Sequence, residues 1–109
     1  MILSTTDVLQ DRAVEEYLGV VSAEVVYGGN ALRDWFAGFR DFFGGRTGSY
    51  ENLFQKGHQQ VLAELQERAE ELDANAVVGI QIDTGTINVD EKGSMMVITG
   101  VGTAVRVAE

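Results

Sequence analysis

One Gly-rich stretch, residues 27–51, holds three of the eight cationic side chains, which could bind an anion or join subunits. Arg46 follows Gly44-Gly45 and precedes a predicted helix N-terminus, where free backbone N–H groups favour anions. Arginine also offers a planar fork of donors that suits ion pairs between subunits. We favour an ion-pair network between subunits over a small-anion site, and keep both interpretations. The candidate residues are Arg33, Asp34, Arg40, Asp41, Arg46, Tyr50 and Glu51.

Known ligand-binding and catalytic patterns are weak in this chain. The Gly-rich loop lacks the Gly-Lys-Ser/Thr ending of nucleotide-binding loops. Soft metals prefer thiolate, thioether or imidazole ligands, and the chain has no Cys and a single His. His58 falls at the edge of a predicted apolar helix row, so we interpret it as a boundary histidine, although a symmetric assembly could repeat one weak ligand. Met95-Met96 is interpreted as a packing pair in a strand. We therefore predict no metal site within one copy and no cofactor.

The triplet Asp83-Thr84-Gly85 matches that of aspartic proteases. That chemistry needs two carboxylates sharing a proton, and a subunit that is almost entirely β. The predicted helices contradict such a subunit, and one histidine gives no convincing Ser/His/Asp set. No enzymatic activity is predicted.

Composition limits the partners. A length of 109 residues corresponds to one domain, 1–109, and the net charge of -9 argues against nucleic acid. Residues 27–51 have no net charge, so the whole net charge of -9 comes from the residues outside them. No basic region followed by an apolar run opens the chain, and no apolar run is long enough for a membrane span. We therefore expect no membrane association and a soluble, cytoplasmic protein.

Periodicity predicts strands at 2–6, 13–27, 76–88 and 94–107, and helices at 31–43 and 50–73. The order β-β-α-α-β-β indicates an α+β fold of two layers, with an antiparallel sheet and two helices on one face. Glu51 is placed in the first turn of the second helix. In the strand at 76–88, Val78, Ile80, Ile82 and Thr84 are expected on one face. The inward row of the second helix is predicted to be Tyr50, Phe54, Val61, Leu62, Leu65, Ala69 and Leu72.

The strand at 13–27 carries apolar residues on both faces, whereas a half-buried antiparallel strand should show one polar face. Leaving such side chains in water forfeits roughly 1.5–3 kcal/mol each. Because the chain's own helices can cover one face only, a second subunit is the expected cover. The row Gly100, Gly102 and Ala104 lacks large side chains, so another element is expected to approach closely there.

Five segments in order resemble the YbjQ family and span nearly the whole chain. They are E-Y-L-G-V-V-S, G-G-N-A-L-R-D-W-F-A-G-F-R-D, G-G-R-T-G-S-Y-E, L-D-A-N-A-V-V-G-I and G-S-M-M-V-I-T-G-V-G-T-A-V. Trp35 stands where Phe would be usual, and Asp73 where the pattern has Gly. Members of that family are often labelled "putative heavy-metal-binding", and no established activity comes with the name.

The resemblance implies a dodecin-like subunit of a ring-shaped homo-oligomer, expected to be a pentamer. Combined with the charged stretch, it predicts a ring whose Arg/Asp/Gly-rich belt lies at the subunit interface. The alternative is a binding module for a small anion or metal ion at that interface. In both cases the principal partner is a second copy of the chain.

Overall fold

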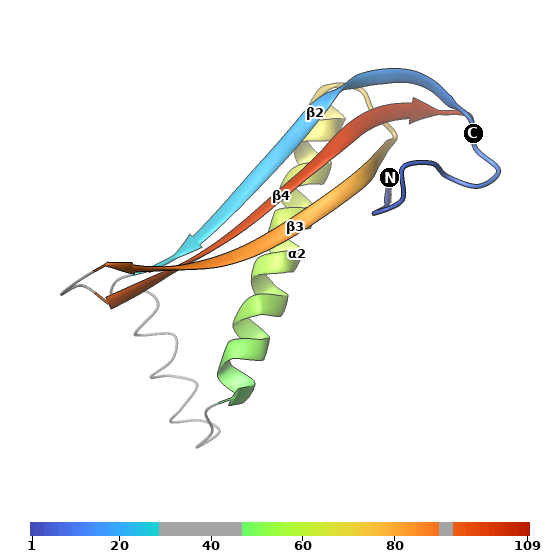
Figure 1. Cartoon of the computed structure of the whole chain (residues 1–109). Coiled ribbons are helices and arrows are strands. Elements are labelled where there is room, and N and C mark those ends of the chain that lie inside the picture. Colours follow the sequence, from blue (N-terminus) through green and yellow to red (C-terminus); the bar gives the residue numbers. More distant parts are fainter. Residues whose placement is uncertain (29–46, 90–92) are drawn as a thin grey trace.

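The computed structural model describes the backbone of residues 1–28, 47–89 and 93–109, and the side chains of 1–28, 53–86 and 95–109 (Figure 1). The first predicted helix, at 31–43, lies outside these residues. The described elements are β1 (Ile2–Leu3), β2 (Val14–Tyr27), α2 (Thr47–Glu71), β3 (Ala76–Val89) and β4 (Gly93–Val107). The three long strands and α2 confirm the predicted α+β class.

The strands form one four-stranded sheet in the order β1-β3-β4-β2. The central strand, β4, pairs antiparallel with both β3 and β2. However, β1 pairs parallel with β3, so the sheet is mixed and the prediction of a purely antiparallel sheet is wrong. A strand of two residues has neither a hairpin nor a periodicity that would reveal its direction in the sequence.

One face of the sheet is covered by α2 (Figure 1). The buried row of the helix repeats every four residues and passes through a glycine, which is why Leu53 was missing from the predicted row. Leu72 was predicted to be inward, but it is 41% exposed because the helix ends at Glu71. The helix also begins at Thr47, earlier than predicted, so Glu51 is not in its first turn. The buried row is Leu53, Gly57, Val61, Leu65 and Ala69.

The helix approaches the sheet most closely where β4 lacks side chains. A Cβ built on Gly100 would collide with Val61 Cγ1 and lie 3.3 Å from Leu65 Cδ1. At Gly57, on the helix side, a Cβ would collide with Ile98 Cδ1. The close approach predicted from the glycine row of β4 is therefore confirmed, and the approaching element is α2.

A second, smaller apolar cluster lies on the opposite face, at the end of the sheet that carries both chain termini. Ile2, Leu9 and Val14 pack there against Ala76, Val78, Val105 and Val107. Val78 was predicted to share a face with Ile80. Gly79, at φ 62°, forms a bulge with a register shift between Val78 and Gln81, and this bulge sends Val78 to the other face.

The end of α2 is stabilised by a reversal of the chain at Asp73, which has φ 64°. The Asp73 N–H donates to Glu70 O and the Ala74 N–H to Ala69 O, both at 3.0 Å, which is the bond pattern of a Schellman motif. Asp73 therefore adopts the left-handed conformation at the position where the family pattern has Gly, and aspartate tolerates that conformation better than most residues.

Asp73→Gly is expected to stabilise the fold by about 1 kcal/mol. The substitution removes the Cβ strain of the left-handed conformation and a negative charge near the negative end of the helix dipole. Urea unfolding at fixed protein concentration measures the change, with Asp73→Asn as the control that removes the charge alone. A destabilising effect of Asp73→Gly would contradict this account of the helix end.

Candidate functional site

Most residues of the predicted charged belt lie outside the described part of the chain. This holds for Arg33, Asp34, Arg40, Asp41 and Arg46. Tyr50 and Glu51 lie within α2, but their side chains are outside the described residues. Whether these residues come together therefore stays a prediction.

The most distinctive surface among the described residues is the sheet face opposite α2, which we call the open face. Strand register fixes its members, because residues paired across a ladder share a face. Ser22, Val101 and Gln81 form one row across β2, β4 and β3, and Glu24, Thr99 and Asp83 form the next. The open face comprises Val20, Ser22, Glu24 and Val26 of β2, Val97, Thr99, Val101 and Thr103 of β4, and Gln81, Asp83 and Gly85 of β3.

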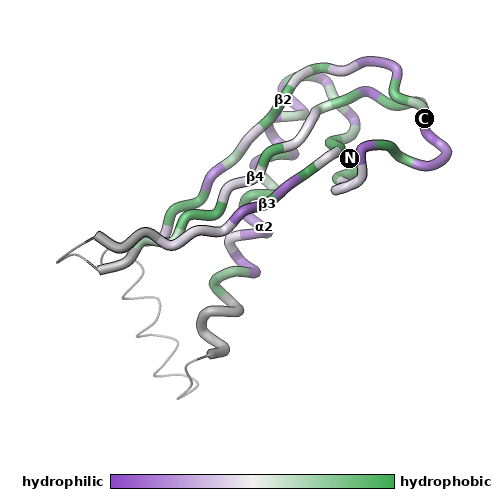
Figure 2. The backbone as a smooth tube through the Cα atoms, in the orientation of Figure 1, coloured by the Kyte–Doolittle hydropathy of each residue, from purple (hydrophilic) through white to green (hydrophobic). Residues whose placement is uncertain are grey.

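Valines on the open face are unusually accessible. Val20 and Val26 of β2 are 73% and 46% exposed, and Val101 of β4 is 47% exposed. On the helix side of β2, Val21 and Val25 are only 5% and 6% exposed. Figure 2 shows apolar segments recurring along β2 and β4. The prediction of apolar residues on both faces of this strand is confirmed for these valines, but Ser22 and Glu24 alternate with them.

One row of the open face carries an acidic side chain at each margin of the sheet. Glu24 and Asp83 are exposed at opposite margins of one row, with the Thr99 hydroxyl between them. The surface therefore combines valines with two carboxylates. Sequence reasoning missed it as a unit because side-chain alternation does not reveal the order of the strands, and because the bulge at Gly79 reverses the alternation in β3.

His58 is half-buried where α2 meets β3. Its Nε2 lies 3.5 Å from Thr84 Oγ1, on the helix side of the sheet. Asp83 is on the open face, so the two groups lie on opposite sides of β3 and cannot act on one substrate. In the described part of the chain, no group of three or more His, Cys, Asp or Glu residues could hold a metal ion.

Met96 and Tyr27 lie at the end of the sheet far from the chain termini. Both pack against the core and form no site. Met96 is 3% exposed and belongs to the main core, as its interpretation as a packing residue predicted. Tyr27 packs against the same core, and burial raises the pKa of its phenol. Within the described residues, no helix combines the length and hydropathy needed to cross a membrane.

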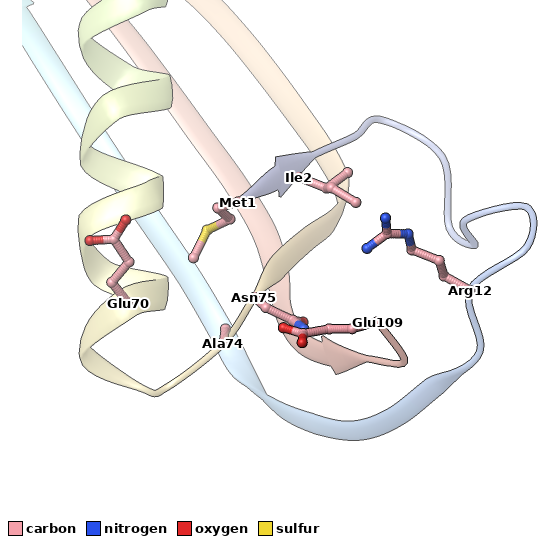
Figure 3. A pocket seen from close by; sticks show the side chains of 7 residues that line it. All are labelled: Met1, Ile2, Arg12, Glu70, Ala74, Asn75 and Glu109. Atoms are coloured by element: carbon pink, nitrogen blue, oxygen red, sulfur yellow. The ribbon is translucent and has the colours of Figure 1, made fainter.

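A hollow of about 360 Å³ lies between the end of α2 and the chain termini (Figure 3). Arg12 lines it from the N-terminal loop and Glu70 from α2. The Asn75 amide nitrogen donates to Val107 O at 2.9 Å, and its oxygen accepts from Val107 N–H at 2.8 Å. Because Asn75 is engaged in this way, its role is to join β3 to β4. The hollow contains no buried polar group that would select a ligand.

A family model described as "Putative heavy-metal-binding" matches residues 1–108 of the chain. It is the model of the YbjQ family. The chain belongs to this family. Among curated YbjQ-type relatives, a UPF0145 protein of Trichodesmium erythraeum is 67% identical over 108 residues, covering 99% of this chain and 100% of its own. A UPF0145 protein of Synechocystis sp. is 59% identical, covering 98% of this chain and 99% of its own.

A solved structure supports the YbjQ fold independently. It is a protein of unknown function of the DUF74 family from Pediococcus pentosaceus, with a TM-score of 0.68 and 18% identity. The match covers 99% of this chain and 98% of that one. At this identity the likeness shows the fold alone. The names of these YbjQ relatives and of this structure state no substrate, ligand or activity.

Proposed function

We propose that this YbjQ protein is the subunit of a homo-oligomer, and that the open face and its margins are covered on assembly. The observation that carries the proposal is the exposure of Val20, Val26 and Val101 on the sheet face that α2 does not cover. The N-terminal segment covers that face only at one end, over Val78, Val105 and Val107. A protein whose function is assembly needs such a surface, whereas an isolated subunit is destabilised by it.

The energetic contribution of this surface is large on the scale of a small domain. Fully burying a valine stabilises by roughly 1.5–3 kcal/mol relative to leaving it exposed. Covering three such side chains therefore compares with the roughly 5–15 kcal/mol by which a typical domain is stable. Glu24 and Asp83 limit the gain, because each carboxylate must keep water or meet a donor.

In the finer form of the proposal, the assembly is a closed ring, expected to be a pentamer, with the charged belt at the interface. The resemblance to the family and the neutral balance of residues 27–51 support it. Arg46→Ala is then expected to weaken association more than it destabilises the subunit. Native mass spectrometry would detect this as a loss of the wild-type stoichiometry. An unchanged stoichiometry would count against the belt.

Val20→Lys is expected to shift the protein toward smaller species, because it places a charge among the valines of the open face. Sedimentation velocity over a range of concentrations measures the shift. The matched control is Val8→Lys: Val8 is 70% exposed, close to the 73% of Val20, but lies in the N-terminal loop. Equal sedimentation of the two variants would remove the open face from the interface.

The alternative function is a binding module for a small anion or metal ion at the interface between copies. The description of the family model favours it, although the described residues of one copy offer no cluster of metal ligands. A ligand at 100 times its Kd stabilises a protein by about 2.7 kcal/mol. A clear rise in melting temperature with Zn²⁺, Cu²⁺ or phosphate would favour this alternative, and an unchanged melting temperature would exclude it for those ions.

A further inference from the structure

Part of a long strand has no described neighbour at each margin of the sheet: the outer side of β2, and the outer side of β3 from Gln81 onward. We propose that the outer edge of β2 pairs with the outer edge of β3 in the next copy, as parallel strands. This inference rests on the proposed self-assembly and specifies the contact that produces it. In this contact, backbone hydrogen bonds between the two strands join the copies in addition to side-chain contacts.

The order β1-β3-β4-β2 places β2, with 14 residues, at one margin of the sheet. At the other margin, the N-terminal segment occupies β3 only as far as Ile80. Ser4 N–H donates to Val77 O at 2.9 Å, Gly79 N–H to Thr6 O at 2.8 Å and Ile80 N–H to Ser4 O at 3.1 Å. From Gln81 onward, no described strand pairs with the outer side of β3, and Figure 1 shows the strands continuing beyond the N-terminal segment.

The two open edges match each other in position and regularity. Beyond its bulges, β2 pairs with β4 without a register shift over 19–27, and β3 pairs with β4 without one over 81–89. Ser22 and Gln81 lie in one row through Val101, so both regular segments are at the same end of the sheet. A second copy placed alongside would therefore bring one edge against the other.

The direction and composition of the edges favour a second copy as the partner. Both β2 and β3 run antiparallel to β4, so they run in the same direction, and a neighbour in the same orientation pairs its β3 parallel to β2. Neither strand contains Lys, Arg or Pro, and over the regular segments only one carboxylate on each strand, Glu24 or Asp83, protects the edge from pairing. Contact between two different edges repeats from copy to copy and closes into a ring when the rotation permits.

Charge and space together select a register. An unshifted pairing would set Glu24 beside Asp83 of the next copy, and directly opposed like charges are unfavourable. A shift by an even number of residues preserves the faces of both strands. A register shift that moves Glu24 toward Gly79 is blocked, because the N-terminal segment already occupies the outer side of β3 as far as Ile80. A register shift that moves Glu24 toward Gly85 keeps the pairing on the part of β3 beyond Ile80. It sets Ser22 beside Asp83 of the next copy.

Cysteine crosslinking tests this contact directly, since the chain has no Cys of its own. Single cysteines are placed on the open face of β2 (Val20, Ser22, Glu24 and Val26) and of β3 (Gln81, Asp83 and Gly85). Variants are mixed in pairs, oxidised and separated under denaturing, non-reducing conditions. Within one copy β4 separates these strands by about 10 Å, beyond the ~7 Å Cα limit for a disulfide, so crosslinks can form only between copies.

Covalent dimers are expected when a β2 variant is mixed with a β3 variant, and not in either variant alone. Ser22→Cys with Asp83→Cys should crosslink more than Ser22→Cys with Gln81→Cys, and the double variant S22C/D83C should give a ladder of higher multimers. Crosslinking of β2 variants with themselves would overturn the proposal, since it would mean that β2 pairs with another β2. If the wild type sediments as an oligomer but no mixed pair crosslinks, the proposal fails while self-assembly stands. A monomeric wild type would remove self-assembly, and this contact with it.

Discussion

Gly100→Val is expected to destabilise the subunit by about 3 kcal/mol, at the upper end of the usual range for overpacking. Gly100 lies where α2 rests on the sheet, and a Cβ there would collide with Val61 Cγ1 and lie 3.3 Å from Leu65 Cδ1. Both neighbours are fully buried, so neither can turn out into solvent. The backbone of α2 would therefore have to move away from β4. Urea unfolding monitored by circular dichroism at fixed concentration measures the loss.

Gly85→Val is the matched control for Gly100→Val. Gly85 is also in the sheet, but nothing lies within 4 Å of a Cβ built on it. Valine suits a strand, and replacing glycine lowers the entropy of the unfolded chain, so the stability of the dissociated subunit should be unchanged or slightly raised. If both variants lost the same stability, the close contact between α2 and β4 would not be the cause.

Leu65→Ala is expected to cost about 3 kcal/mol, within the range of leucine truncations in protein cores. The side chain is completely buried between α2 and the sheet and belongs to the main apolar cluster. Its removal leaves a cavity that Val61 and Gly100, on either side, cannot fill. Leu72→Ala is the control on the same segment, with an expected cost below about 1 kcal/mol because Leu72 is 41% exposed.

The two sites should also be coupled. Because Leu65 Cδ1 lies 3.3 Å from the position of a Gly100 Cβ, truncating Leu65 relieves its part of the crowding there, while the collision with Val61 Cγ1 remains. Leu65→Ala with Gly100→Ala should therefore cost less than the sum of the two single variants. Strict additivity would mean that the two residues do not meet in the folded subunit.

The long elements of this fold could be predicted from sequence because their periodicity is strong. The strand predicted at 13–27 is β2 (Val14–Tyr27), and the strand predicted at 94–107 is β4 (Gly93–Val107). The reversal at Asp73 was also foreseeable, since aspartate tolerates the left-handed conformation better than most residues.

Side-chain placement was predictable only where no backbone irregularity intervened. Gly79 reverses the alternation of β3, and a glycine codes equally for a bulge, a turn or a close contact. Gly57 interrupts the apolar row of α2 in the sequence while continuing it in space, which concealed Leu53. The open face depends on the bulge at Gly79 and on the strand order, so it could be recognised only in three dimensions.

Of the candidate site, the sequence indicated a charged belt and a need for a second subunit. The valines of β2 support the second expectation, since Val20 is exposed on the side opposite α2. A belt between subunits involves residues of two copies, and no pattern within one chain specifies how copies meet. The strand edges are more informative, because backbone N–H and C=O groups that have no described partner can pair with another strand whatever the side chains are.

Sedimentation equilibrium of the wild-type chain at micromolar concentration is the most direct test of self-assembly. We expect a particle several times heavier than the 11.8 kDa subunit, with native mass spectrometry giving a single discrete stoichiometry. A cooperatively folded particle of 11.8 kDa that shows no association over the same concentrations would contradict the account.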